Sequence, residues 1–369
     1  MLRKLACLFA LFGTSLLATA GEVPGYKVLA PITQGRLTVF PIVAAGAHDA
    51  SGFITLDEGV RSGEVVVTEA GQLPRMIRRP GTVLPQGGSA RVNTLVLLNN
   101  SDKPLLLLAG EIVTGGKQDR VIAKDRIVPP HSDPIDLGVF CVEPGRWTGA
   151  SNEFKSMGAQ MVQPSVRREA MAKKDQQAVW DSVRSSTNET VEVVAAAPAI
   201  NTSQSSAGTV VGGNGLPAEL HSTTSYAKVM SDKSVQQQVD KIAEPVLREY
   251  KSMIAQLREK NAVGVVAAVN GQILWADIFS SPQLLERYWA KLVRSYAAEA
   301  MITRAAYSKA DIGSAQDFVN SLGGKREVSE TEPGVFRQTE VTGDGYRVFE
   351  LTSLLPKMGF EVHIAKMMQ

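Results

Sequence analysis

Short apolar runs separated by turn-forming residues fill the chain from Tyr26 to Trp147. The runs are rich in Val, Leu and Ile, and clusters of Asn, Asp, Ser and Pro interrupt them, which is typical of short strands joined by turns. No segment of this half has a clear helical period. The pattern predicts a β-sandwich-like fold with strands at Leu37–Val43, Gly52–Leu56, Val65–Glu69, Ala90–Leu98, Leu105–Thr114, Val121–Ile127 and Ile135–Val142.

The apolar period changes after Trp147. Helical spacing over residues 166–183 predicts a helix whose apolar positions are Val166, Ala170, Val179, Trp180 and Val183. From about Ser185 to Thr224 the chain is dominated by Ser, Thr, Asn, Gly and Ala, a composition that cannot bury enough apolar surface to order itself. We therefore expect a linker or a long loop there.

The C-terminal part contains both helix-like and strand-like apolar patterns. Apolar residues every three or four positions predict a helix over residues 235–257, with a kink or break at Pro245. Asn270-Gly271 supplies the positive φ angles of a type I′ turn, so the runs Val263–Val269 and Gln272–Phe279 should form a hairpin.

Two further elements follow that hairpin. Ser280 or Ser281 can cap a helix that begins near Pro282. A second hairpin should turn at Asp344-Gly345. The expected fold class is α+β, with a β-sandwich-like N-terminal half and an α+β C-terminal half. The expected division is a signal peptide at 1–20, a β-rich domain at 21–150, a helical extension at 151–184, a low-complexity linker or loop at 185–224 and an α+β domain at 225–369.

The first residues have the features of a secretory signal peptide. Arg3 and Lys4 precede an apolar run, and Ala18-Thr19-Ala20 before Gly21 fits the small-x-small cleavage rule. The apolar run is shorter than the roughly 20 residues of a membrane span, and Cys7 lies inside it rather than at the cleavage point. The sequence therefore predicts an exported, periplasmic or secreted protein without a stable membrane anchor.

Charge and cysteine content argue against a nucleic-acid partner and against an internal disulfide. Without Arg3 and Lys4, the 39 basic residues of the chain become 37 and equal its 37 acidic residues. No long basic run remains, so we expect no nucleic-acid partner. Cys141 is the only cysteine beyond the signal peptide, so an internal disulfide cannot form.

Polar residues crowd the stretch Leu105–Trp147, between runs expected to be buried. Packing alone would not select them, so we expect a binding site or a reaction there. The polar residues are Glu111, Lys117, Gln118, Asp119, Arg120, His131, Glu143 and Arg146.

Gly115-Gly116-Lys117 invites comparison with a phosphate-binding P-loop. That motif needs four residues between its first glycine and Gly-Lys, followed by Ser or Thr, whereas here five residues intervene and Gln118 follows. The P-loop is excluded. Two alternatives stay open: a backbone turn whose N–H groups, with Lys117 and Arg120, face an anion, or a glycine bend with solvated charges.

Cys141 is a candidate nucleophile. An imidazole such as His131, oriented by Glu143 or Asp133, could activate the thiol. The alternative is an inert core cysteine. The four histidines lie at positions 48, 131, 221 and 363, none at ligand spacing, so the sequence predicts no metal site and no cofactor.

Glu143 and Arg146 flank the turn dipeptide Pro144-Gly145. They could reach together toward a pocket beside Trp147, which would offer a flat stacking surface, or they could form a salt bridge while Trp147 packs in the core. The sequence leaves both alternatives open.

The stretches GEIVTGGKQDRV, CVEPGRW, QQAVWDSV and VNGQILWADIFSSPQLLERYWAKLV resemble a family of unknown function, the ADP-ribosylglycohydrolase and rhodanese-phosphatase-superfamily-associated protein domain. The resemblance covers nearly all of the mature chain except about Ser185–Thr224. It implies at most a nucleotide or phosphorylated-sugar ligand and no established catalytic residues. The matching polar positions are Glu111, Lys117, Gln118, Arg120, Glu143, Arg146 and Trp147.

Three hypotheses about function follow. The first is an exported protein that binds a small anionic, nucleotide- or sugar-phosphate-like ligand through its β-rich half. The second is an extracytoplasmic hydrolase that uses Cys141 with His131 or a carboxylate. The third is a structural envelope protein without a small ligand. The sequence names no protein partner.

Overall fold

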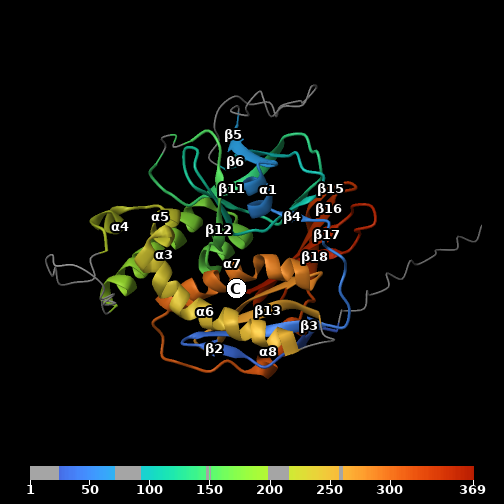
Figure 1. Cartoon of the computed structure of the whole chain (residues 1–369). Coiled ribbons are helices and arrows are strands. Elements are labelled where there is room, and N and C mark those ends of the chain that lie inside the picture. The colour runs from blue at the N-terminus through green and yellow to red at the C-terminus, as the bar shows by residue number, and fades with distance from the viewer. Residues whose placement is uncertain (1–24, 71–92, 147–148, 150, 198–215, 257–260) are drawn as a thin grey trace, which may run out of the picture.

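The computed structural model describes residues 25–70, 93–146, 149, 151–197, 216–256 and 261–369 (Figure 1). The predicted signal peptide and Trp147 lie outside the described residues. The fold is α+β, as the sequence predicts. None of the helices in the described ranges combines the length and apolar character needed to cross a membrane.

A large antiparallel sheet combines strands from residues 27–44 with strands from residues 261–368. Its strand order is β1-β3-β13-β14-β18-β17-β16-β15, and β2 also pairs with β3. The strands are β1 (Lys27–Val28), β2 (Ile32–Gln34), β3 (Leu37–Ala44), β13 (Asn261–Val269), β14 (Gln272–Phe279), β15 (Lys325–Glu332), β16 (Phe336–Thr342), β17 (Tyr346–Ser353) and β18 (Glu361–Met368). Strands β1 and β3, which precede the expected boundary near residue 150, thus belong to the same sheet as the C-terminal strands.

Both predicted hairpins are present. Asn270 and Gly271 have φ angles of 53° and 81° at the turn between β13 and β14, as a type I′ turn requires. Gly345, with a φ of 72°, lies in the turn between β16 and β17. Local turn chemistry therefore sets these two pairings.

Helices cover both faces of the large sheet (Figure 1). Helices α6 (Lys233–Gln256) and α7 (Pro282–Ile302) lie on one face, and α8 (Ile312–Asn320) packs on the other. Ser281 caps α7 by accepting a hydrogen bond from the Leu284 N–H at 3.2 Å, as predicted. Pro245 lies within α6 without ending it.

The β-rich part consists of two smaller sheets that share a core, which confirms the sandwich-like prediction. The core holds apolar side chains of both sheets, such as Leu107, Val113 and Val139. The three-stranded sheet contains β10 (Arg126–Val128), β7 (Leu105–Leu107) and β4 (Ile54–Thr55); the six-stranded sheet contains β12 (Lys155–Met161), β8 (Glu111–Thr114), β9 (Arg120–Ile122), β11 (Ile135–Cys141), β6 (Thr94–Asn99) and β5 (Val65–Glu69).

The β-rich part contains a helix that the sequence pattern does not predict. Helix α1 (Leu56–Ser62) follows directly after β4, where the pattern predicts only a strand. Its signal is local: Thr55 accepts from the Glu58 N–H and Glu58 accepts from the Thr55 N–H, which is a capping box.

In the described residues, five helical segments connect the two parts. They are α2 (Pro164–Arg168), the π-helical turn η2 (Glu169–Lys173), α3 (Gln176–Ala196), α4 (Ala218–Ser222) and α5 (Tyr226–Ser231). Helix α3 extends beyond residue 184, where the composition predicts that order ends, because Thr187, Thr190, Val191 and Val194 form a buried face. Of the expected linker or loop, residues 198–215 lie outside the described residues.

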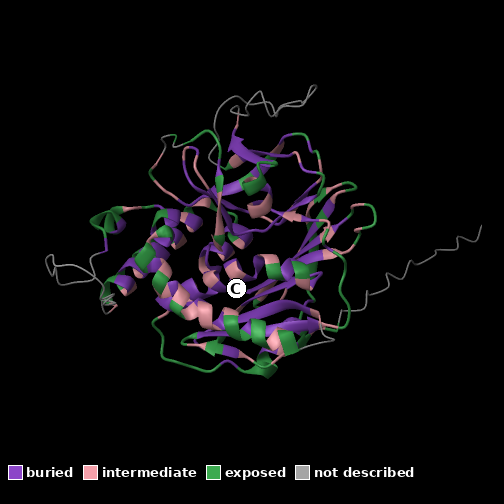
Figure 2. Cartoon of the chain, in the orientation of Figure 1, coloured by how far each residue is buried: buried purple, intermediate pink, exposed green. Residues whose placement is uncertain are grey.

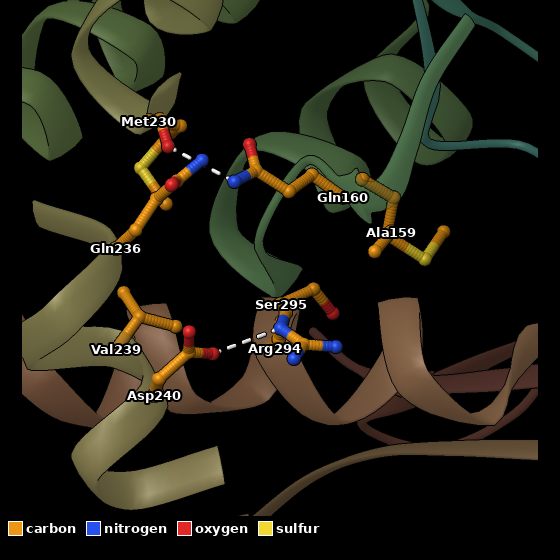
Figure 3. A pocket seen from close by; sticks show the side chains of 9 residues that line it. Ala159, Gln160, Met230, Gln236, Val239, Asp240, Arg294 and Ser295 are labelled. Atoms are coloured by element: carbon orange, nitrogen blue, oxygen red, sulfur yellow. Dashed lines mark hydrogen bonds and ion pairs between the residues drawn. The ribbon is translucent and has the colours of Figure 1, made fainter. Parts of the chain in front are cut away.

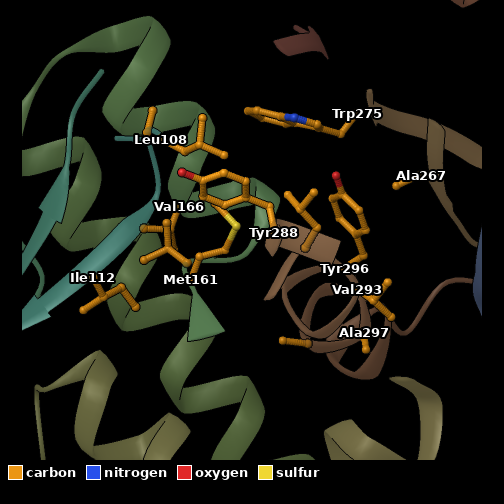
Figure 4. Close-up of a cluster of buried hydrophobic side chains, with 14 of the residues drawn as sticks. Leu108, Ile112, Met161, Val166, Ala267, Trp275, Tyr288, Val293, Tyr296 and Ala297 are labelled. Atoms are coloured by element: carbon orange, nitrogen blue, oxygen red, sulfur yellow. The ribbon is translucent and has the colours of Figure 1, made fainter. Parts of the chain in front are cut away.

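The main core lies between the large sheet and the β-rich part (Figure 2). In Figure 4, Tyr288 of α7 lies close to Met161 of β12 and Val166 of α2, and Val293 lies by Tyr296 and Ala297 of the same helix. Helix α7 therefore has an almost continuous buried surface.

Candidate functional site

The predicted glycine turn joins β8 to β9, and we call residues Gly115–Arg120 the glycine loop. Gly115 and Gly116 have φ angles of 130° and 50°. A Cβ atom on Gly116 would collide with the Phe154 ring. Only glycine therefore fits the turn at position 116.

The N–H groups of the glycine loop do face anions, and these are carboxylates of the chain itself. The Gly115 N–H donates to Asp119 at 3.0 Å, and the Lys117 N–H donates to Glu69 at 2.9 Å. The Asp119 N–H donates to Glu143 at 3.1 Å. The backbone arrangement matches the first alternative, but internal side chains take the place of a ligand.

The cations of this cluster have carboxylate partners as well. Arg146 Nη2 lies 2.6 Å from Glu143 and 3.5 Å from Asp119, so the salt bridge between Glu143 and Arg146 is present. Arg120 is fully buried, with Nη2 3.9 Å from Glu69. The three carboxylates Glu69, Asp119 and Glu143 thus equal in number the cations Lys117, Arg120 and Arg146, so this group of side chains has no net positive charge to attract an anion.

Two other residues of the predicted site, Gln118 and Glu111, bind other groups of the chain itself. Gln118 is buried and donates to the Glu143 carbonyl at 3.0 Å. Glu111 lies elsewhere, 2.6 Å from Lys291 of α7, which also contacts Asp57 at 2.6 Å. Burial raises the pKa of Glu111, although Lys291 opposes that shift. Glu111 therefore joins β8 to α7 and does not line the glycine loop.

The structure separates the candidate nucleophile from its candidate base. His131 precedes β11 and lies 2.7 Å from Asp102, whereas Cys141 ends β11 opposite Arg120. A strand of seven residues spans roughly 20 Å. Burial raises the pKa of the Cys141 thiol to about 11, so the thiol stays protonated at neutral pH. The geometry matches the inert core cysteine.

A buried chain of charges that the sequence analysis missed crosses the interior. His363 Nδ1 lies 2.6 Å from Asp125, and its Nε2 lies 3.2 Å from Asp277. Arg167 Nη1 lies 2.9 Å from Asp277, which also accepts a hydrogen bond from the Tyr296 hydroxyl. We call these five residues the buried relay. Their signal was a lone Asp in the apolar strand WADIF and a lone His in EVHIAKM.

The relay joins the β-rich part to the large sheet and the helices. Asp125 follows β9, Asp277 and His363 belong to β14 and β18, and Arg167 and Tyr296 come from α2 and α7. All five side chains are buried. Through these contacts the relay links strands and helices of both parts of the fold.

Two consecutive arginines of α2 point to different places. Arg167 points into the relay, and Arg168 lines a cavity of about 510 Å³. We call this the basic cavity. The residues that line it are Arg168, Glu169, Ala172, Lys173, Arg347, Met367, Met368 and Gln369.

The π-helical turn shapes one wall of the basic cavity. The Lys174 N–H donates to the Glu169 carbonyl at 3.0 Å across five residues, and Lys174 adopts a φ of 56°. Asp175 then caps α3 by accepting from the Ala178 N–H. Such π-turns occur often at functional sites.

Positive charge exceeds negative charge around the basic cavity. Glu169 lies 3.5 Å from Arg168 and 2.8 Å from Lys173. Glu340 lies 2.9 Å from Arg347 and 2.7 Å from Lys174. Each carboxylate therefore forms ion pairs with two cations. The four cationic side chains are 30–65 % exposed. Of these side chains, the ones that line the cavity are the cations Arg168, Lys173 and Arg347 and one carboxylate, Glu169.

A second cavity, of about 210 Å³, lacks this excess (Figure 3). It lies between β12, α5, α6 and α7. Its cation Arg294 is 2.9 Å from Asp240 and 2.6 Å from Glu244. Gln160 donates across the cavity wall to the Met230 carbonyl at 3.0 Å. Of these two cavities, the basic cavity is the one whose lining holds more cations than carboxylates.

Comparison with known proteins gives one finding. The model of a family described as ARG and Rhodanese-Phosphatase-superfamily-associated Protein domain (ARPP-1) matches residues 25–364. The matched range includes the glycine loop, the buried relay and the three cations that line the basic cavity. No curated protein and no solved structure matches the chain.

Proposed function

The chain belongs to the ARG and Rhodanese-Phosphatase-superfamily-associated Protein domain family, and from this premise we propose that it binds a small phosphate-bearing ligand in the basic cavity. The observation that carries the proposal is that three cationic side chains, Arg168, Lys173 and Arg347, and one carboxylate side chain, Glu169, line that cavity. A phosphate would relieve their repulsion through charge-assisted hydrogen bonds.

Size and family support a nucleotide-like ligand. A volume of about 510 Å³ falls within the roughly 300–1,000 Å³ of small-molecule sites. We interpret the ARG of the family description as ADP-ribosylglycohydrolase, which favours ADP-ribose-like molecules. The proposed site differs from the glycine loop, where internal carboxylates neutralise the cations.

Phosphate-bearing ligands should stabilise the protein against thermal unfolding. At about 100 times the dissociation constant, linkage gives a gain of roughly 2.7 kcal/mol, which raises the melting temperature. We would measure this rise with ADP-ribose, ADP, sugar phosphates and inorganic phosphate. Arg168→Gln combined with Lys173→Gln should abolish it, because both cations line the cavity.

Two control variants make this test specific. Lys325→Gln removes a cation that is 78 % exposed on β15 and should leave the rise unchanged. Lys117→Gln tests the glycine loop and should also leave it unchanged. A rise that is lost only with Lys117→Gln would move the site to the β-rich part. No rise with any of the four ligands would refute the binding proposal and leave the structural hypothesis.

We also propose that the protein is exported. The support is the pattern of Arg3, Lys4, the apolar run and Ala18-Thr19-Ala20. N-terminal sequencing of the exported protein should give Gly21 as the first residue. Retention of Met1 in the exported protein would contradict the proposal.

A further inference from the structure

The cavity of about 210 Å³ between β12, α5, α6 and α7 has both charged and apolar walls (Figure 3). We call it the Arg294 cavity. Arg294 of α7 and Asp240 of α6 line it, and their side chains are 21 % and 40 % exposed, so the cavity is open to solvent. The apolar lining residues are Ala159, Met161, Met230 and Val239.

The guanidinium of Arg294 is held at one edge and available at the other. Its Nε lies 2.9 Å from Asp240 and its Nη2 lies 2.6 Å from Glu244, so two carboxylates of α6 fix the plane of the group. Nη1 has no hydrogen-bond partner in the described part of the chain, and it is accessible rather than buried. Arg294 therefore offers two fixed N–H donors to an occupant of the cavity.

Acceptors lie beside these donors. Asp240 uses Oδ1 for its ion pair with Arg294, and no described residue donates to its Oδ2. The side-chain amide of Gln236, one turn earlier on α6, also has no partner among the described residues and is not buried. Gln160 differs, because its amide already donates to the Met230 carbonyl at 3.0 Å and forms part of the wall. Asp240 and Gln236 thus supply the accessible acceptors of the cavity.

The charges of this group disfavour ions as ligands. Two carboxylates surround one guanidinium, so an anion would be repelled. A cation would meet an Asp240 that is already paired and would face the N–H groups of Arg294. The arrangement therefore favours a neutral molecule that accepts from Arg294 and donates to Asp240.

Neighbouring hydroxyl groups on a ring meet both requirements. Each hydroxyl is a donor and an acceptor at once, so two adjacent hydroxyls can accept from Nη1 and donate to Oδ2 together. The C–H groups of a sugar ring can contact the apolar wall at Ala159 and Met230. The volume lies below the roughly 300–1,000 Å³ of sites for drug-sized ligands, which limits the occupant to about one ring.

We propose that the Arg294 cavity binds a neutral monosaccharide unit, with two adjacent hydroxyls on Arg294 Nη1 and Asp240 Oδ2. The Gln236 amide binds a further hydroxyl of the same ring. No lining residue is shared with the basic cavity, so this proposal and the phosphate proposal can fail independently.

Saturation-transfer difference NMR with the full chain tests the proposal. The probes are D-glucose, D-galactose, D-mannose, N-acetyl-D-glucosamine and D-ribose, and at least one should show saturable binding. Arg294→Lys keeps a positive charge beside Asp240 but removes the fixed Nη1 donors, and should weaken that binding at least about 10-fold. Arg304→Lys makes the same change at the exposed ion pair with Glu192 and should leave the affinity unchanged.

A blocking variant assigns the binding to the cavity. Ala159→Phe fills the cavity from an exposed position on β12 and should abolish saturable binding, with an unchanged circular dichroism spectrum. Arg168→Gln combined with Lys173→Gln changes only the basic cavity and should leave sugar binding intact. The proposal would be overturned by the absence of saturable binding for all five sugars, or by full affinity in Arg294→Lys or in Ala159→Phe. Tighter binding of glucose 6-phosphate than of glucose, removed by Ala159→Phe, would assign an anion to the cavity and would also overturn it.

Discussion

Asp277→Ala should lower the free energy of unfolding by about 3–5 kcal/mol, the usual effect of removing one partner from a buried ion pair. Asp277 contacts Arg167 at 2.9 Å and His363 at 3.2 Å, and all three side chains are buried. Arg167 and His363 lower the pKa of Asp277 against the effect of burial. Without this carboxylate, Asp125 would be the only acid of the relay left to neutralise two buried cations. Urea unfolding at neutral pH measures the loss.

A matched control and a second substitution sharpen this prediction. Asp181→Ala removes a carboxylate that is 60 % exposed and 3.8 Å from Arg184, and should change stability by at most about 0.5 kcal/mol. Arg167→Met in the Asp277→Ala background should restore part of the loss, because the uncompensated guanidinium is removed. A loss below about 1 kcal/mol for Asp277→Ala would mean that the relay does not stabilise the fold.

Elements encoded by neighbouring residues could be predicted from the sequence. Asn270-Gly271 determines one hairpin, and Ser281 with Pro282 determines where α7 begins. Each signal acts within a few residues, so local stereochemistry is sufficient. The capping box of Thr55 and Glu58 is equally local, but the apolar pattern around it favours a strand.

The assembly of these elements could not be predicted in the same way. Strand β3 pairs with β13 more than 200 residues later, with Val265 opposite Pro41. Both strands have apolar residues on both faces, so their pattern does not identify a partner. Helix α3 extends beyond residue 184 because tertiary packing buries its Thr and Val face, and composition alone gives no sign of that packing.

For the candidate sites as well, the sequence predicts local features but not the partners that the fold brings to them. The glycine turn and its inward N–H groups were predictable from Gly115 and Gly116, but one of the anions that they face, Glu69, comes from β5. The cations of the basic cavity come from α2, η2 and β17. No spacing in the sequence connects Arg168 with Arg347, so only the fold brings them together.

The stability of the protein should fall as the pH rises from about 6.5 to 8, and His363 is the cause. Burial alone would lower its pKa, but Asp125 and Asp277 outweigh burial and raise the pKa from 6.5 to about 9. The folded state thus keeps a proton that the unfolded chain releases. The stabilisation is complete below pH 6.5 and is lost as the pH rises through about 9. The shift is equivalent to roughly 3 kcal/mol.

Glu361 adds a second, lower window with the same sign. Burial, followed by the charge of Glu350, raises its pKa from 4.5 to about 7, so stability should also fall between these values. Urea midpoints should therefore decline in two stages between pH 4.5 and 8. Above about pH 8 proton loss from Lys366, whose pKa burial lowers from 10.5 to about 8, has the opposite sign and offsets part of the His363 effect. Glu361→Gln should remove the first stage and leave the second.

His363→Gln should remove the second stage. NMR titration of the imidazole in the unmutated protein gives a readout that does not depend on that variant folding. An imidazole that titrates near pH 6.5, or a urea midpoint that stays constant from pH 7 to 8, would show that the relay does not hold His363 in its charged form.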